Sequence, residues 1–183
     1  LAVYAKDGTL RVYDQNTGAV LTDTVVAPIE GLQRTDLYNV DGGWVWLRQY
    51  DNGDYEVTTS TICGPNGTNK TLDLDAIKAR YGAGFHGYLW PVTAAGGEFY
   101  LSVSYQGPGQ NWLYDLIDST GNVVLAGLGS CNGYYTDTAN PLPDGVFVAR
   151  KGFEYGWMDL HGQWVYCQNI FYSSGDDAEN YYF

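Results

Sequence analysis

Basic residues are scarce in this sequence, with 9 Lys and Arg against 21 Asp and Glu and a net charge of −12. Nucleic-acid phosphates and anionic membrane surfaces both attract basic patches, so this balance argues against either partner. No apolar run approaches the roughly 20 residues of a membrane-spanning helix, and we expect no membrane insertion. The acidic surplus favours solubility, with attraction of a cationic partner or Ca²⁺ as the alternative.

The residues of common catalytic and metal motifs are also few. The three cysteines, Cys63, Cys131 and Cys167, include no Cys-x-x-Cys pair, so no zinc site is predicted. One disulfide with one free thiol, or three buried thiols, remain open. There are two histidines, His86 and His161, and no Gly-x-Ser-x-Gly elbow, phosphate loop or dinucleotide fingerprint. We expect no catalytic residue, no metal and no cofactor.

Tyrosine, tryptophan and glycine are abundant, at 17, 6 and 24 residues, whereas methionine occurs once. Aromatic residues suit pleated strands, and glycine permits the positive φ angles of tight turns, so the composition predicts an all-β fold. A length of 183 residues fits one domain. The first residue is Leu1, from which we expect a removed signal sequence or a domain cut from a longer protein. The composition, low in lysine, favours a secreted or cell-surface location.

A glycine turn followed by an apolar strand recurs along the chain. The turn glycines are Gly18, Gly67, Gly121 and Gly162, with a mean spacing of about 48 residues, which is typical of β-propeller blades and related arrays. Before each of them, two strands flank an earlier turn, and a third strand follows. The predicted first strands are 2–5, 44–50, 99–105 and 146–149, the second strands 10–14, 55–62, 112–117 and 157–160, and the third strands 19–21, 72–74, 123–125 and 164–166.

Aromatic residues in the longer connections offer a short fourth strand for each unit, at 37–38, 88–90, 134–135 and 181–183. The one predicted helix covers residues 74–81, with Asp73 as its N-cap and Gly82 at its end. We therefore predict a propeller-like array of about four units with three or four antiparallel strands each. The approximate units are 1–42, 43–96, 97–144 and 145–183. A closed ring, in which the last strand pairs beside the first, and an open arc are both compatible with this order.

The last unit carries a recognisable motif. Residues 155–165 read Tyr-Gly-Trp-Met-Asp-Leu-His-Gly-Gln-Trp-Val, which resembles a bacterial WG repeat. Residues 111–115 with 121–124 match more loosely, and residues 9–21 resemble a generic propeller hairpin, whereas the second copy departs from the pattern. The resemblance implies a β-repeat, propeller-like architecture and no common chemistry.

The chain has many carboxylates, and two of them facing each other across a cleft could hydrolyse a glycoside. The candidates are Asp41, Asp115, Asp159, Asp176, Asp177 and Glu179. However, Asp14, Asp118 and Asp159 recur just before the turn glycine, where an Asp side chain accepts backbone N–H bonds. We interpret these recurring residues as turn-shaping rather than catalytic.

Aromatic side chains remain the best functional signal, because Trp and Tyr stack on sugar rings and anchor protein interfaces. We expect Trp44, Trp46, Trp112 and Trp157, which lie in predicted strands, to be core residues. The predicted ligand-contact residues lie in the connections and are Phe85, Trp90, Tyr134 and Tyr135.

These observations favour a non-catalytic recognition or scaffold domain outside the cytoplasm that binds a protein or a glycan. A glycan-acting hydrolase with two loop carboxylates is the first alternative. A structural spacer within a longer surface protein is the second.

Overall fold

The computed structural model describes residues 1–27, 34–40, 43–50, 59–82, 85–132 and 142–169. These residues form four antiparallel sheets, one α-helix and two short 3₁₀ turns, which confirms the predicted all-β class and its single helix. The strands in chain order are β1 (Ala2–Tyr4), β2 (Thr9–Tyr13), β3 (Val20–Val25), β4 (Arg34–Val40), β5 (Trp44–Tyr50), β6 (Thr59–Cys63), β7 (Asn69–Thr71), β8 (Phe85–Ala95), β9 (Glu98–Gln106), β10 (Trp112–Asp118), β11 (Val123–Leu128), β12 (Ser130–Asn132), β13 (Val146–Lys151), β14 (Glu154–Asp159) and β15 (Trp164–Asn169).

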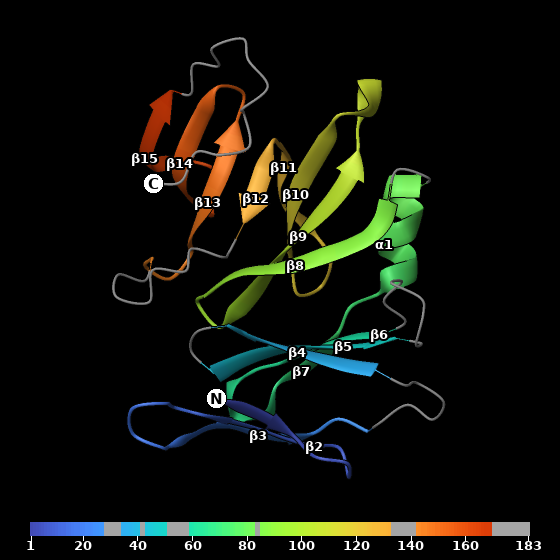
Figure 1. Cartoon of the computed structure of the whole chain (residues 1–183), viewed down its shortest axis with the longest axis vertical. Coiled ribbons are helices and arrows are strands. Elements are labelled where there is room, and N and C mark those ends of the chain that lie inside the picture. The colour runs from blue at the N-terminus through green and yellow to red at the C-terminus, as the bar shows by residue number, and fades with distance from the viewer. Residues whose placement is uncertain (28–33, 41–42, 51–58, 83–84, 133–141, 170–183) are drawn as a thin grey trace.

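Each sheet pairs strands that are consecutive in the chain. The first sheet has the order β1-β2-β3, and the other three are β4-β5-β6-β7, β8-β9-β10-β11 and β12-β13-β14-β15. The four sheets follow one another along the molecule in chain order (Figure 1). The first strands of the second, third and fourth sheets are neighbours in turn, because β4 contacts β8, and β8 contacts β12.

The strands predicted in the connections do not close the unit that precedes them. Residues 37–38 lie in β4 and residues 88–90 in β8, as predicted, but each of these strands pairs with the strand that follows it. The second sheet therefore begins at Arg34, ahead of the predicted unit boundary at 43, and the third begins at Phe85, ahead of 97. The strands predicted at 134–135 and 181–183 lie outside the described residues.

Three hydrophobic clusters fill the spaces between successive sheets. Val12 packs with Val45 between the first and second sheets, Trp46 with Leu101 between the second and third, and Leu116 with Phe147 between the third and fourth. Side chains alternate between the two faces of a strand, so one strand serves two clusters. On β9, for example, Phe99, Leu101 and Val103 share one face and all lie in the middle cluster.

Four tryptophans test the predicted core. Trp44 and Trp46 are buried as expected. Trp157 is only half-buried and packs on Tyr166, with 5.5 Å between the ring centroids. The prediction for Trp112 is wrong, because its side chain is 42% exposed.

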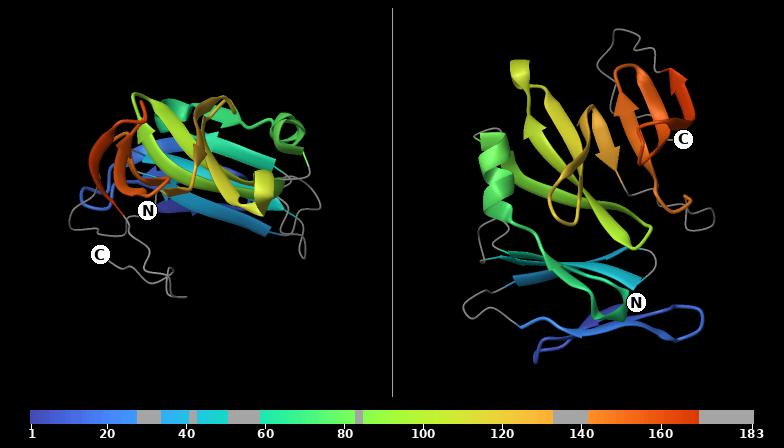
Figure 2. Two further views of the ribbon diagram at one scale, coloured as in Figure 1. Left: turned by 90° about the horizontal axis from the view of Figure 1, so that it is seen from above. Right: turned by 180° about the vertical axis from the view of Figure 1, so that it is seen from behind.

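Helix α1 (Leu74–Tyr81) has the predicted bounds and caps. Asp73 Oδ1 accepts the Ala76 N–H at 2.9 Å, and Gly82 ends the helix with a positive φ of 57°. This cap corrects the predicted third strand at 72–74, because the strand instead ends at Thr71. The helix lies beside the third sheet (Figure 2), where Arg80 donates to the Gly121 carbonyl at 2.6 Å. No helix in the described ranges is long and apolar enough to cross a membrane.

Candidate functional site

Exposed aromatic side chains gather where the third sheet meets the fourth. Along β10, every second side chain lies on the face toward the fourth sheet: Leu116 is fully buried, Tyr114 is half-buried and Trp112 is 42% exposed. This gradient shows that the fourth sheet covers only one end of β10. Trp90, on the first strand of the third sheet, is 37% exposed.

A first depression of about 310 Å³ contains Trp90 and Tyr114. Its other lining residues are Ser130, Cys131 and Asn132, which together form β12. Because β12 contacts both β8 and β10, it brings the polar residues Ser130 and Asn132 to the depression that Trp90 and Tyr114 line.

The Trp90 ring is supported by side chains of the second sheet. Tyr38 meets it edge to face, with centroids 6.2 Å apart, and the Arg48 guanidinium lies 5.6 Å from its centroid. The Arg48 guanidinium lies 4.3 Å from the centroid of the Tyr38 ring and 4.7 Å from that of the Trp46 ring, and it pairs with Asp36 at 3.4 Å. These contacts hold Trp90 in place without covering it, which is how a binding platform is pre-organised.

A second depression of about 520 Å³ lies next to the first and shares Tyr114 with it. The lining combines aromatic and polar side chains with one leucine and three glycines. The lining residues are Asn111, Trp112, Leu113, Tyr114, Gly127, Gly129, Arg150 and Gly152.

Arg150 is fixed across Gly129 on the wall of this second depression. Its Nη2 donates to the Gly129 carbonyl at 3.3 Å, and the Gly129 N–H donates to the Arg150 carbonyl at 2.8 Å. A Cβ at position 129 would lie 2.6 Å from Arg150 Nε, so only glycine leaves room for the guanidinium here.

The structure separates the predicted ligand-contact residues. Trp90 lines the first depression, whereas Phe85 packs against the middle cluster beside Tyr81, with ring centroids 6.3 Å apart. Tyr134 and Tyr135 lie outside the described residues. The sequence analysis did not identify Trp112, Tyr114 and Arg150 as site residues. The alternation along β10, which places Trp112 and Tyr114 on the face opposite Leu113 and Ile117, could have indicated the first two.

The recurring aspartates are structural, as predicted. One oxygen of each carboxylate accepts two backbone N–H groups at 2.7 to 2.9 Å, from Asn16 and Thr17 for Asp14, from Thr120 and Asn122 for Asp118, and from His161 and Gln163 for Asp159. Asp115 is buried and accepts bonds from Tyr81 Oη, Tyr105 Oη and the Gly127 N–H. Asp41, Asp176, Asp177 and Glu179 lie outside the described residues.

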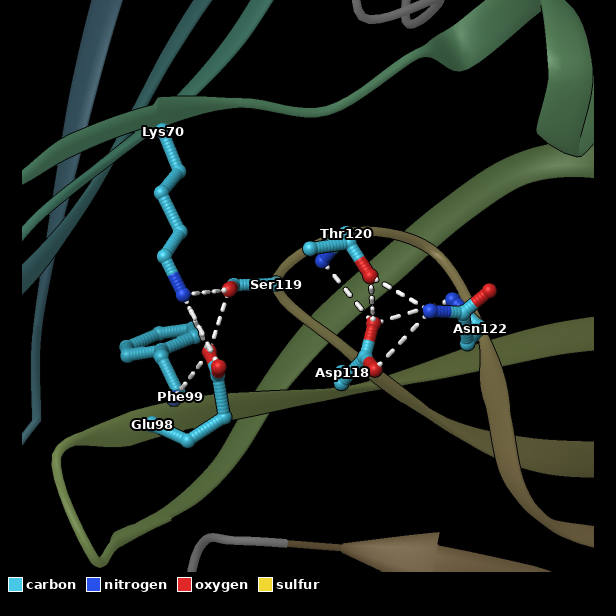
Figure 3. Close-up of polar contacts among 7 residues, drawn as sticks. All are labelled: Lys70, Glu98, Phe99, Asp118, Ser119, Thr120 and Asn122. Atoms are coloured by element: carbon cyan, nitrogen blue, oxygen red, sulfur yellow. Dashed lines mark hydrogen bonds and ion pairs between the residues drawn. The ribbon is translucent and has the colours of Figure 1, made fainter.

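A polar cluster outside the two depressions joins the second sheet to the third (Figure 3). Lys70 Nζ lies 2.8 and 3.0 Å from the two Glu98 oxygens and 2.7 Å from Ser119 Oγ, which itself donates to Glu98. Partial burial would raise the pKa of Glu98, but the bonds from Lys70, Ser119 and the Phe99 N–H together hold it below its ordinary value. Ser119 is only 1% exposed, so a substrate cannot reach it, and we interpret the cluster as a clamp between sheets.

The cysteines form no disulfide, which corrects that alternative. Cys63 and Cys131 are buried free thiols and Cys167 is exposed, so the alternative of three buried thiols is also wrong. Burial raises the pKa of Cys63 to about 12 and also raises that of Cys131, so neither is a thiolate at neutral pH. Within the described ranges, no three His, Cys, Asp or Glu side chains cluster as metal ligands.

Fold and site together define a β-sheet array with an aromatic and polar depression between its third and fourth members. The family model described as Domain of unknown function (DUF5046) matches residues 1–177, and the chain belongs to this family. No curated protein and no solved structure matches the chain.

Proposed function

We propose that this protein is a non-catalytic recognition domain that binds a glycan or a protein at the junction of the third and fourth sheets. The observation that carries the proposal is the arrangement of Trp90, Tyr114 and Trp112. All three lie around two adjoining depressions, and Trp90 and Trp112 keep more than a third of their surface exposed. Exposed, rigidly held aromatic side chains next to polar groups are typical of ligand sites.

The composition of the lining supports binding rather than hydrolysis. Although the chain has 21 Asp and Glu, none of the residues lining these two depressions is a carboxylate. Glycoside hydrolysis needs a pair of them near the scissile bond. Of the candidate carboxylates in the described ranges, Asp159 is instead bonded within a turn, and Asp115 accepts bonds from the half-buried Tyr81 and Tyr105 hydroxyls.

We further propose that the sheets form a propeller-like array of the kind to which WG repeats belong. The support is the chain-order succession of antiparallel sheets and the contacts between their first strands, β4, β8 and β12. A secreted or cell-surface location is part of the same proposal, and it rests on the acidic, aromatic-rich composition.

The experiment is a binding screen against a glycan array and a peptide array, with unaltered chain and the Trp90→Ala/Trp112→Ala double variant. We expect the unaltered chain to retain a ligand that the double variant loses. The unaltered chain should release no hydrolysis product from that ligand. Tyr166→Ala is the matched control, since Tyr166 is 53% exposed but lies in β15, away from both depressions. Equal retention by the double variant, a hydrolysis product or no ligand on either array would contradict the proposal, and the last result would favour a spacer.

A further inference from the structure

The two depressions between the third and fourth sheets have a common wall. Tyr114 lines both of them, and Gly129 of one is followed directly in the chain by Ser130 of the other. We propose that they form one continuous groove and that the groove binds a chain of neutral sugar residues. This inference rests on the proposed recognition function and names the ligand class.

The spacing of the aromatic side chains requires a ligand longer than one sugar ring. Trp112 and Tyr114 are two residues apart on β10, which corresponds to about 7 Å along a strand. Trp90 lies on β8, and β9 separates that strand from β10, so the two strand axes are about 10 Å apart. A ligand that touches Trp90 and Trp112 together is therefore a chain of several rings.

The polar groups of the lining match the hydroxyls of sugars. Asn111, Ser130 and Asn132 carry side chains that both donate and accept hydrogen bonds, which suits a hydroxyl that does the same. Arg150 adds a guanidinium, and Gly127 and Gly152 leave the backbone open to close approach, since no atom lies within 4 Å of where a Cβ would stand. Apolar ring faces on the tryptophans and hydroxyl edges on these polar groups would satisfy both parts of a pyranose.

Charge narrows the class of glycan. The net charge of −12 produces a field that repels polyanions, including chains of uronic acids and sulfated sugars. A site for a cationic peptide would be expected to contain carboxylates. The residues lining the two depressions include none, which argues against such a ligand. A neutral oligosaccharide is compatible with both observations, because its affinity depends on stacking and hydrogen bonding.

The test is titration calorimetry with the cello-, xylo- and manno-oligosaccharide series, from disaccharide to hexasaccharide. For at least one series we expect affinity to rise about tenfold or more with length. Trp112→Ala and Trp90→Ala should each weaken the hexasaccharide about tenfold and flatten the length dependence. Tyr166→Ala should change neither, and thermal unfolding of each variant verifies that it is folded.

Three results would overturn the inference, and they are distinguishable from failure of the proposed function. If only one tryptophan variant affects binding, the depressions are separate sites. If oligogalacturonate binds and the neutral series do not, the ligand is anionic. If a proline-rich or other peptide binds in a Trp112-dependent manner and no sugar does, the groove recognises protein, and the recognition function still stands. If no ligand binds in a groove-dependent manner, both the recognition function and the neutral-sugar inference are wrong.

Discussion

At the scale of single residues, one carboxylate oxygen shapes the repeat turn at Asp14, at Asp118 and at Asp159. Asp118 Oδ1 accepts the backbone N–H groups of Thr120 and Asn122, both at 2.9 Å. We expect Asp118→Ala to lower the free energy of unfolding by about 1 kcal/mol, because two donors lose their partner. Asp118→Asn, which keeps a side-chain carbonyl, should cost less. Urea denaturation measures both, and an Asp118→Ala variant as stable as the unaltered chain would contradict this role.

Gly156, in the WG-like motif, cannot be replaced by a larger residue without a steric clash. A Cβ at Gly156 would lie 2.1 Å from the Tyr166 carbonyl oxygen on the neighbouring β15. We expect Gly156→Ala to cost about 3 kcal/mol, the upper end for overpacking. The control is Gly152→Ala, where no atom lies within 4 Å and the positive φ of 62° alone costs about 1 kcal/mol. Equal losses in denaturant melts would show that β15 is not so closely packed.

Residue-level reasoning succeeded where the interaction is local. The Asp73 cap and the turn carboxylates of Asp118 and Asp159 involve partners within four positions of the chain, so the sequence alone predicts them. The exposure of Trp112 could not be predicted in this way. It depends on how far the fourth sheet extends over β10, which is a tertiary property that strand periodicity does not encode.

At the scale of elements, the clamp of Lys70, Glu98 and Ser119 ties β7 to β9 and to the turn before β11. Replacing Glu98 with Gln should cost about 1–2 kcal/mol at neutral pH, since a charge-assisted bond is lost. The folded-state pKa of Glu98 lies below its ordinary value of 4.5, so its contribution is complete above that pH and is lost as pH falls through the folded pKa.

Urea denaturation of both proteins from pH 7 to pH 3 measures this dependence. The stability gap between unaltered chain and Glu98→Gln should be widest at pH 7 and should narrow in acid. Lys70→Gln and the double variant complete a mutant cycle, in which the two losses should be less than additive. A gap that is constant across the pH range, or strictly additive losses, would show that the carboxylate does not stabilise the junction.

At the scale of the whole molecule, the fold is a series of sheets joined by three inter-sheet clusters. The glycine turns and the aromatic-rich composition predicted antiparallel sheets, because both are tied to the local geometry of strands and hairpins. They did not predict that β4 and β8 pair with the strand that follows, since an isolated aromatic strand can pair with either neighbour. The groove was also beyond sequence reasoning, apart from Trp90, because Tyr114 and Arg150 come from different sheets.

Hydrogen–deuterium exchange of the chain with and without a saturating neutral hexasaccharide tests the groove most directly. We expect slower exchange in residues 111–114, 127–132 and 150–152, which carry most of the lining, and unchanged exchange in β1, β2 and β3. Unchanged exchange throughout, or slower exchange confined to the first sheet, would contradict a ligand site between the third and fourth sheets.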